Sequence, residues 1–109
     1  MATPCCPTVP EACCSLAISE PDQERLMSMM KAISNPLRFE VLKFLVAHPG
    51  CMTGDIVEHL PIAQATVSQH LKVLRDAGWI VGTIEGPARC YCLNAEAVTW
   101  FRERIAAIF

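Results

Sequence analysis

The apolar residues of this chain follow the period of a helix over most of its length and change to strand alternation near residue 79. Four segments between residues 19 and 77 place apolar side chains three or four positions apart, which is typical of helices with one buried face. The stripes are Leu26, Met29, Met30 and Ile33; Leu37, Val41, Leu42, Leu45 and Val46; Ile56, Val57 and Leu60; and Val67, Leu71 and Leu74. The pattern predicts four helices ahead of the strands.

Capping and breaking residues bound the first two helices. Ser19 precedes an acidic first turn and predicts the start of the first helix, which ends near Asn35. Asn35 then caps the second helix with Pro36 in its first turn, and His-Pro-Gly at 48–50 ends it.

The third and fourth predicted helices are joined by a turn of only a few residues. Thr53 can cap the third helix, and Pro61 closes it. The fourth runs from about Gln64 to Ala77, and Gly78 supplies a left-handed end. Two helices joined by so short a turn predict a helix-turn-helix.

Strand alternation over residues 79–84 and 89–93, separated by Glu-Gly-Pro-Ala, predicts a β-hairpin. Asn94 then caps a last helix. Its apolar stripe is Val98, Phe101, Ile105 and Ile108. The predicted fold class is therefore mostly α with a β-hairpin wing, a winged helix-turn-helix.

The domain organisation follows from length and composition. A chain of 109 residues fits one domain, which we assign to residues 19–109. Residues 1–18 hold three prolines, four cysteines and no helical period, so we expect a flexible arm there. Hydrophobic residues make up 52% of the chain, which leaves apolar surface for a partner subunit.

The sequence predicts a cytoplasmic protein without a membrane segment. No stretch approaches the roughly 20 apolar residues of a membrane span, and the N-terminus lacks the pattern of a secretory signal. In a reducing compartment, seven cysteines indicate metal binding or redox sensing more than a disulfide scaffold. The odd number favours the same interpretation.

The net charge of −2 argues against a protein that coats nucleic acid through bulk positive charge. Basic residues are nevertheless concentrated locally. Segment 64–89 carries three basic residues and two acidic ones. Residues 1–36 carry two basic residues and four acidic ones. Any contact with DNA is therefore expected to be small and local.

Two stretches of the sequence resemble the ArsR-type family of arsenical- and metal-responsive repressors, and the resemblance covers roughly residues 20–105. They read NPLRFEVLKFLV and ATVSQHLKVLRDAGWIVGTIEGPARCYCLN. The matching features are the Asn-Pro-x-Arg opening of the second helix, Thr-Val-Ser-x-His-Leu in the fourth, and Leu-x-x-Ala-Gly before the wing.

The resemblance implies a homodimer, formed by the first and last helices, that binds operator DNA. Two copies of the fourth helix would then read half-sites about one DNA turn, roughly 34 Å, apart. The residues expected to contact DNA are Gln64, Thr66, Ser68, Gln69 and Lys72, with Arg89 on the wing. The alternative is that this polar face is only solvated surface.

For His70 and Ala63 we expect structural roles. His70 lies between core positions and is expected to be a packed, hydrogen-bonded histidine. Ala63 stands where the family often has a capping serine, and alanine caps poorly, so the fourth helix is expected to start loosely.

The cysteines indicate a soft ligand, since thiolates select ions such as trivalent arsenic or antimony, zinc or copper(I). Two sites known in the family are missing. The cysteine box of the third helix is replaced by Met-Thr-Gly-Asp-Ile at 52–56, and residues 95–109 contain no histidine for a zinc site. A typical zinc sensor is therefore not expected.

The preferred inducer site combines Cys13 and Cys14 with Cys51. Adjacent cysteines rarely form a disulfide with each other, but both can bind one large soft ion. Trivalent arsenic prefers three thiolates. The segment around Cys13 and Cys14 resembles the arm of some arsenic-responsive members, and that resemblance implies a third ligand from the loop after the second helix of the other subunit, where Cys51 lies. We expect bound arsenic(III) or antimony(III) to release the operator.

Other cysteine sets remain open. Cys90 and Cys92 lie two positions apart on one strand face, roughly 7 Å apart, and could share an ion or form an oxidant-driven bridge. Cys5 and Cys6 could replace the other vicinal pair, while Cys51 and Cys90 could also be small buried apolar residues. A repressor that senses thiol oxidation or persulfides is thus the alternative function.

The sequence argues against two further classes of protein. A cysteine enzyme is not expected, because no Cys-x-x-Cys opens a helix and no phosphate-binding loop follows a cysteine. The histidines, at positions 48, 59 and 70, lie within or beside the helical core elements and offer no obvious base. An interaction module without DNA binding would leave the wing and the polar helix face without a role.

Overall fold

The first two helices begin at the capping residues that the sequence predicts. The structure, a computed structural model, describes residues 15–49, 51–85 and 88–109, with side chains undescribed at 51–54, 83–85 and 88–89. Helix α1 (Glu20–Ile33) starts after Ser19, whose side chain accepts from the Asp22 N–H at 3.4 Å. Helix α2 (Pro36–Ala47) starts after Asn35, whose Oδ1 accepts from two backbone N–H groups at 2.9 and 3.1 Å.

The helix-turn-helix predicted from the sequence is present as α3 (Thr53–His59) and α4 (Gln64–Ala77). Thr53 is the first residue of α3 and not the residue before it. Gly78 ends α4 at φ 96°, in the left-handed region that favours glycine, and its N–H donates to the Arg75 carbonyl at 3.0 Å.

The hairpin is also confirmed, with β2 (Ile80–Glu85) antiparallel to β3 (Ala88–Leu93). A further strand, β1 (Cys51–Met52), pairs with the other edge of β3 and gives the sheet order β1-β3-β2. The expectation that Cys51 lies in a loop is wrong. A strand of two residues carries no alternation to detect, because it is defined by its pairing with a segment some 40 positions away.

Gly82 shows how closely the two strands of the wing pack. It pairs with Tyr91, which is buried at 5% exposure. A Cβ at position 82 would lie 2.8 Å from the Tyr91 Cε1 atom. Only glycine therefore fits beside the ring in its present position.

The core lies where α1, α2, α3 and α4 meet the sheet. Its buried residues are Met29, Ala32, Val41, Leu42, Leu45, Ile56, Val67, Leu71, Leu74, Trp79, Ile80, Tyr91 and Ala97. Three residues of the predicted stripes, Met30, Leu37 and Val46, are instead exposed at 40%, 46% and 57%. Their helices carry a wider apolar face than the single chain covers.

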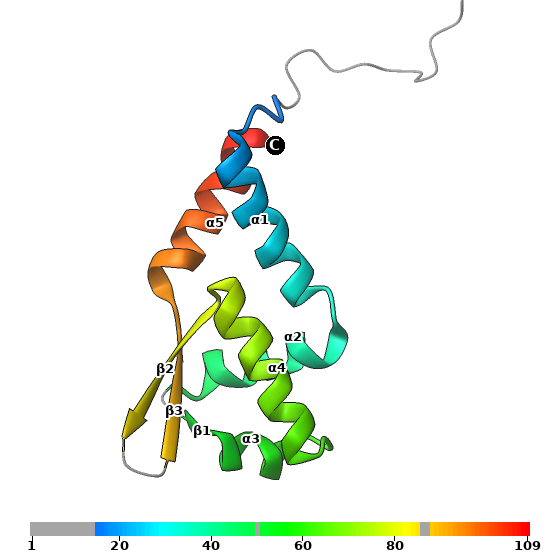
Figure 1. Ribbon diagram of the computed structural model, residues 1–109, viewed down its shortest axis with the longest axis vertical. Helices are drawn as coiled ribbons and strands as arrows, with labels where there is room; N and C mark the ends of the chain where they lie inside the picture. Colours follow the sequence, from blue (N-terminus) through cyan, green and yellow to red (C-terminus); the bar gives the residue numbers. More distant parts are fainter. Residues whose placement is uncertain (1–14, 50, 86–87) are drawn as a thin grey trace, which may run out of the picture.

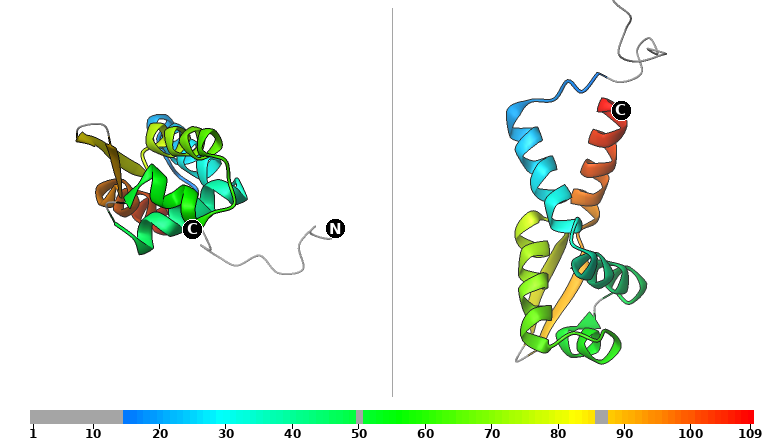
Figure 2. Two further views of the ribbon diagram at one scale, coloured as in Figure 1. Left: turned by 90° about the horizontal axis from the view of Figure 1, so that it is seen from below. Right: turned by 90° about the vertical axis from the view of Figure 1, so that its right-hand side faces the viewer.

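Helix α5 (Ala95–Ile108) follows the sheet and runs beside α1, and the two extend away from the body (Figures 1 and 2). Trp79 joins them to the core. Its indole N–H donates to the Met29 carbonyl of α1 at 2.7 Å, and its ring lies 4.9 Å from that of Phe101 in α5. No helix in the described ranges is long and apolar enough to span a membrane.

Candidate nucleic-acid interface and thiol site

Helix α4 separates an apolar face from a polar one, as the sequence predicts. Val67, Leu71 and Leu74 are at most 1% exposed and belong to the core. The opposite face carries exposed residues expected to meet DNA, which are Gln64, Ser68, Gln69 and Lys72. Thr66 is half-buried and so offers less of its side chain to a partner.

The start of α4 has the weak cap expected at Ala63, which makes no side-chain hydrogen bond to the helix. The first turn of α4 also contains no acidic residue. Its backbone N–H groups and the positive end of the helix dipole are therefore left for an external anion, as at other helix starts that contact phosphate.

Two arginines, one on the wing and one on α4, are further basic residues of this part of the molecule. Arg89 pairs with Ile84 through the β2–β3 ladder, but its side chain lies outside the described part of the molecule. Arg75, which is not among the residues expected to contact DNA, has a side chain that is 43% exposed and lies 3.7 Å from the Asp76 carboxylate. Its position three residues after Lys72, on the same helix face, was the signal that could have found it.

His70 is half-buried between core positions, as expected, but its predicted hydrogen bonding is wrong in part. The buried Nε2 atom has no hydrogen-bond partner. Desolvation by burial, followed by the positive charge of Arg38, lowers the pKa of His70 from its ordinary value of 6.5.

We expect the stability of the fold to decrease as the pH falls below about 6.5, in part because of His70. In that window the unfolded chain binds a proton on His70 while the folded chain does not, so protonation favours unfolding. Urea unfolding at pH 7.5, 6.5 and 5.5 tests this for the wild type and for His70→Gln. The variant should show a flatter dependence, and an unchanged slope would rule out His70 as a contributor.

The wing carries two of the candidate cysteines on the side of the sheet that faces away from the core. Cys90 is half-buried and Cys92 exposed, and they flank the buried Tyr91 in β3. Their Cα atoms are about 6.6 Å apart at the rise of a strand. The two side chains therefore lie on the same side of β3.

The structure describes only the backbone of Cys51 and none of the arm cysteines. The backbone of Cys51 pairs with that of Tyr91, next to Cys90 and Cys92 in the sheet, but its side chain is undescribed. The arm cysteines, Cys5, Cys6, Cys13 and Cys14, lie outside the described residues. Among the described side chains, no three potential metal ligands gather.

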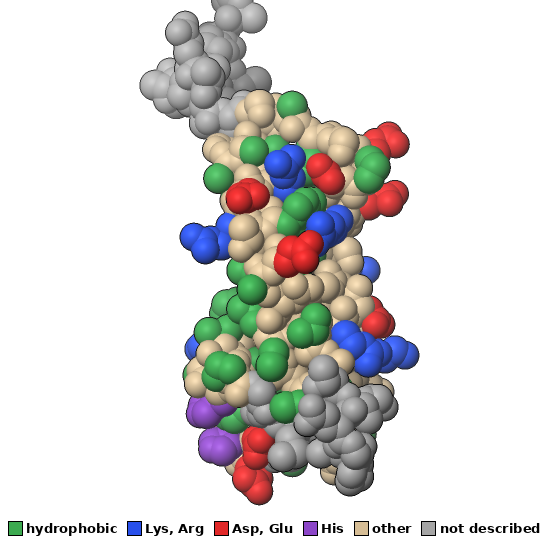
Figure 3. Space-filling model, turned by 90° about the vertical axis from the view of Figure 1, so that its left-hand side faces the viewer, with side chains coloured by type: hydrophobic (Ala, Val, Ile, Leu, Met, Phe, Trp, Pro, Cys, Tyr) green, Lys and Arg blue, Asp and Glu red, His purple; other side chains and the backbone are tan. Residues whose placement is uncertain are grey.

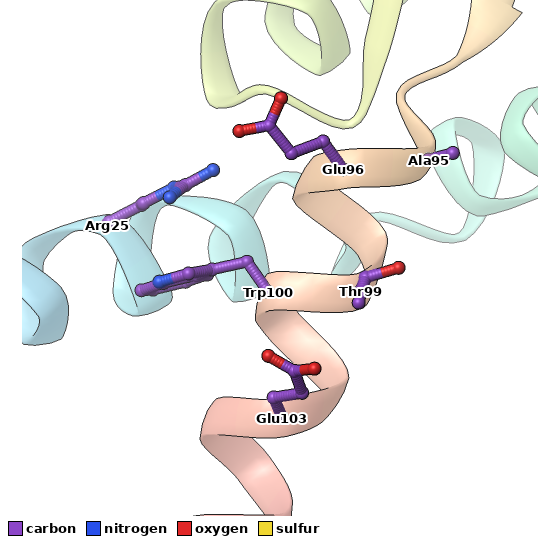
Figure 4. Close-up of a pocket in the computed structure, with 6 residues that line it drawn as sticks. All are labelled: Arg25, Ala95, Glu96, Thr99, Trp100 and Glu103. Atoms are coloured by element: carbon purple, nitrogen blue, oxygen red, sulfur yellow. The ribbon is translucent and has the colours of Figure 1, made fainter.

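A surface hollow between α1 and α5 is lined by a cation–π pair (Figure 4). The Arg25 guanidinium carbon lies 4.1 Å from the centre of the Trp100 ring, and Glu96 and Glu103 flank Trp100 along α5. Close by, Arg104 lies 3.6 Å from the Asp22 carboxylate. These surface contacts join α1 to α5.

Comparison with known proteins fits this architecture. Residues 35–80 match the profile of a family described as "Bacterial regulatory protein, arsR family". The HTH-type transcriptional regulator YgaV of Escherichia coli (strain K12) is 30% identical over 83 residues, which cover 76% of this chain and 84% of that protein. The chain belongs to the arsR family. The expectations of a winged helix-turn-helix regulator and of no enzymatic activity are thereby confirmed.

Other relatives differ in the ligand that their names imply. The "Arsenical resistance operon repressor" of Staphylococcus xylosus is 29% identical, over 78% of this arsR-family chain and 81% of that protein. The cadmium sensor CMTR of Mycobacterium tuberculosis is 31% identical, with a TM-score of 0.57 over 71% of this chain and 76% of that one. An ArsR-like regulator from Rhodococcus sp. RHA1 shares the fold at a TM-score of 0.71 and 22% identity, over 80% and 84% of the two chains.

Proposed function

We propose that this arsR-family protein is a cytoplasmic repressor that binds operator DNA as a homodimer and is released by trivalent arsenic or antimony. Cys13 and Cys14 of one subunit, with Cys51 of the partner subunit, would bind the metalloid. The main support for DNA binding is that α4 has a buried apolar face and an exposed polar face. The inducer part depends on the cysteines and on the arsenical-resistance relative.

Operator recognition is supported by the chemistry of the α4 surface. Gln69 and Ser68 can exchange hydrogen bonds with base edges in the major groove, and Lys72 can neutralise a phosphate. The start of α4 lacks both a side-chain cap and an acidic residue, which favours an approach to the DNA backbone. Arg75 continues the basic edge and is a further candidate for phosphate contact.

Replacing residues of this face should separate specificity from affinity. Gln69→Ala and Ser68→Ala should reduce discrimination between operator and random DNA by about 1–3 kcal/mol where a base contact is lost. Lys72→Ala should weaken binding to both and lower the slope of log affinity against log salt by about one. Fluorescence anisotropy with operator and random duplexes over a salt series measures both effects. Equal losses of specificity in all three variants would contradict the assignment.

Chain connectivity supports the proposed contribution of the partner subunit. The Leu16 N–H donates to the Ile108 carbonyl at 3.1 Å, so the described chain begins beside the far end of α5. Cys14 immediately precedes Ser15, and consecutive Cα atoms are about 3.8 Å apart. Helix α1, with 14 residues and a length of about 21 Å, separates this point from the body that holds β1 (Figure 1). Cys51 of the same chain is therefore a poor third ligand.

Cys13→Ser and Cys14→Ser should each leave operator binding intact and abolish release by arsenite. A serine hydroxyl is a hard ligand and cannot replace a thiolate on a soft ion. The test is an arsenite titration of the reduced protein bound to labelled operator, with Cys92→Ser as the matched control on an exposed thiol. Retained induction in both arm variants, with loss in the control, would move the site to the wing.

A thiol-redox or persulfide sensor is the second candidate, and the positions of Cys90 and Cys92 favour it. Both lie on the outer side of β3, two residues apart. A persulfide or peroxide would take two electrons and two protons from the two thiols to leave one disulfide. Release of DNA by such an oxidant, but not by arsenite, would replace the metalloid proposal with this one.

A further inference from the structure

His48 and His59 lie side by side on the surface, although they come from the ends of different helices. His48 follows α2 and His59 ends α3, and their ring centres are 6.0 Å apart with an interplanar angle of 35°. Phe44 supports both, with ring-centre distances of 4.3 Å to His48 and 5.1 Å to His59. Histidine side chains accordingly gather at one place on the face in Figure 3. Both histidines lie at helix ends, within or beside the helical elements as the sequence predicts, and both side chains are exposed.

The hydrogen bonds of the two rings fix which nitrogen is available. The Nδ1 atom of His48 lies 3.2 Å from the Phe44 carbonyl oxygen, and that of His59 lies 2.8 Å from the Asp55 carbonyl oxygen. A carbonyl oxygen can only accept, so Nδ1 is the protonated nitrogen in each ring. The neutral ring then has its lone pair on Nε2. Metal-binding histidines are held in this way, with the second nitrogen donating to a backbone or carboxylate oxygen.

The spacing of the rings also suits one shared ion. Zinc binds histidine nitrogen at about 2.0–2.1 Å, which places the centres of two rings on one ion about 5–6 Å apart for N–Zn–N angles from tetrahedral upward. The observed 6.0 Å is at the wide end of that range.

We propose that His48 and His59 form a binding site for a divalent transition ion such as zinc or nickel, coordinated by both Nε2 atoms. Imidazole nitrogens suit these borderline ions, whereas trivalent arsenic prefers thiolates. The site is therefore separate from the inducer site proposed above. No third protein ligand gathers there among the described side chains, so water completes the coordination and we expect micromolar affinity.

Bound metal would cross-link α2 to α3, the first helix of the helix-turn-helix. A DNA phosphate is the competing ligand for these exposed rings. A neutral Nε2 has no proton to donate to a phosphate, whereas its lone pair can bind a cation directly. The tautomer that the backbone carbonyls select thus favours the metal.

The test is zinc titration of the full reduced protein, followed by the ring Hε1 and Hδ2 signals of its three histidines in NMR spectra. These signals report on imidazoles even though the thiols also bind zinc. We expect the signals of His48 and His59 to shift together with a single midpoint, while those of His70 stay in place. His59→Gln should weaken the response of His48 roughly tenfold or more, and His48→Gln that of His59, as expected when a chelating partner is lost.

His70→Gln is the matched control, since it removes a histidine outside the pair and should leave the joint shift unchanged. Separate midpoints for the two rings, or a response of one that survives loss of the other, would overturn the proposal. A response of both rings to duplex DNA but not to zinc would replace it with a phosphate contact.

Discussion

Met27→Glu is expected to produce a monomer and to lower operator affinity roughly 100-fold or more, because a monomer engages one half-site instead of two linked ones. Met27 and Met30 are 50% and 40% exposed on α1, and Phe109 at the end of α5 is 66% exposed. A face of this kind on the two helices that extend from the body is typical of a subunit interface. A charged carboxylate placed there would lose its hydration on dimerisation without gaining a partner.

Sedimentation velocity and DNA binding by the same preparations would measure this effect. Met27→Leu keeps the volume and polarity of the side chain and should remain dimeric. Val81→Glu places the same charge on an apolar residue of β2 that is 47% exposed, away from α1 and α5. A dimeric Met27→Glu variant with full operator affinity would show that α1 is not in the interface.

Trp79→Ala is expected to lower the free energy of unfolding by about 3–5 kcal/mol, a large part of the usual stability of a domain. The indole is 6% exposed and connects α1 and α5 to the core through the Met29 carbonyl and the Phe101 ring. Its removal leaves a cavity at this junction. Trp79→Phe keeps most of the ring and loses the hydrogen bond, so we expect a cost nearer 1 kcal/mol plus some packing.

Urea unfolding at one fixed protein concentration compares these variants, since dimerisation also contributes to apparent stability. Trp100→Ala provides the matched control. Trp100 is only partly buried, and its contact with Arg25 is a surface cation–π pair worth about 0.5–1 kcal/mol. Equal destabilisation by Trp79→Ala and Trp100→Ala would show that Trp79 has no special role at the junction.

The elements with a strong local signal were predicted closely. Helix α4 has the predicted bounds, because its apolar stripe, the left-handed Gly78 and the preceding turn all indicate the same ends. Its inward and outward faces followed from the helical period alone. The caps of α1, α2 and α5 at Ser19, Asn35 and Asn94 were found for the same reason, since a cap acts within three residues of itself.

Features that depend on distant segments escaped prediction. Strand β1 exists because β3 offers it an edge, and the proximity of His48 to His59 exists because α2 and α3 end side by side. The sequence also gave no indication that Met30, Leu37 and Val46 would be exposed, since periodicity identifies an apolar face but not how much of it a single chain covers.

The sequence by itself determined the order of the elements, the winged helix-turn-helix and the polar face of α4, because helical period, caps and turn residues act over a few neighbouring positions. The tertiary structure alone decided which cysteines and histidines come together and how α1 and α5 are joined to the body. Those arrangements depend on contacts such as that between Trp79 and Met29, 50 residues apart, which no local pattern encodes.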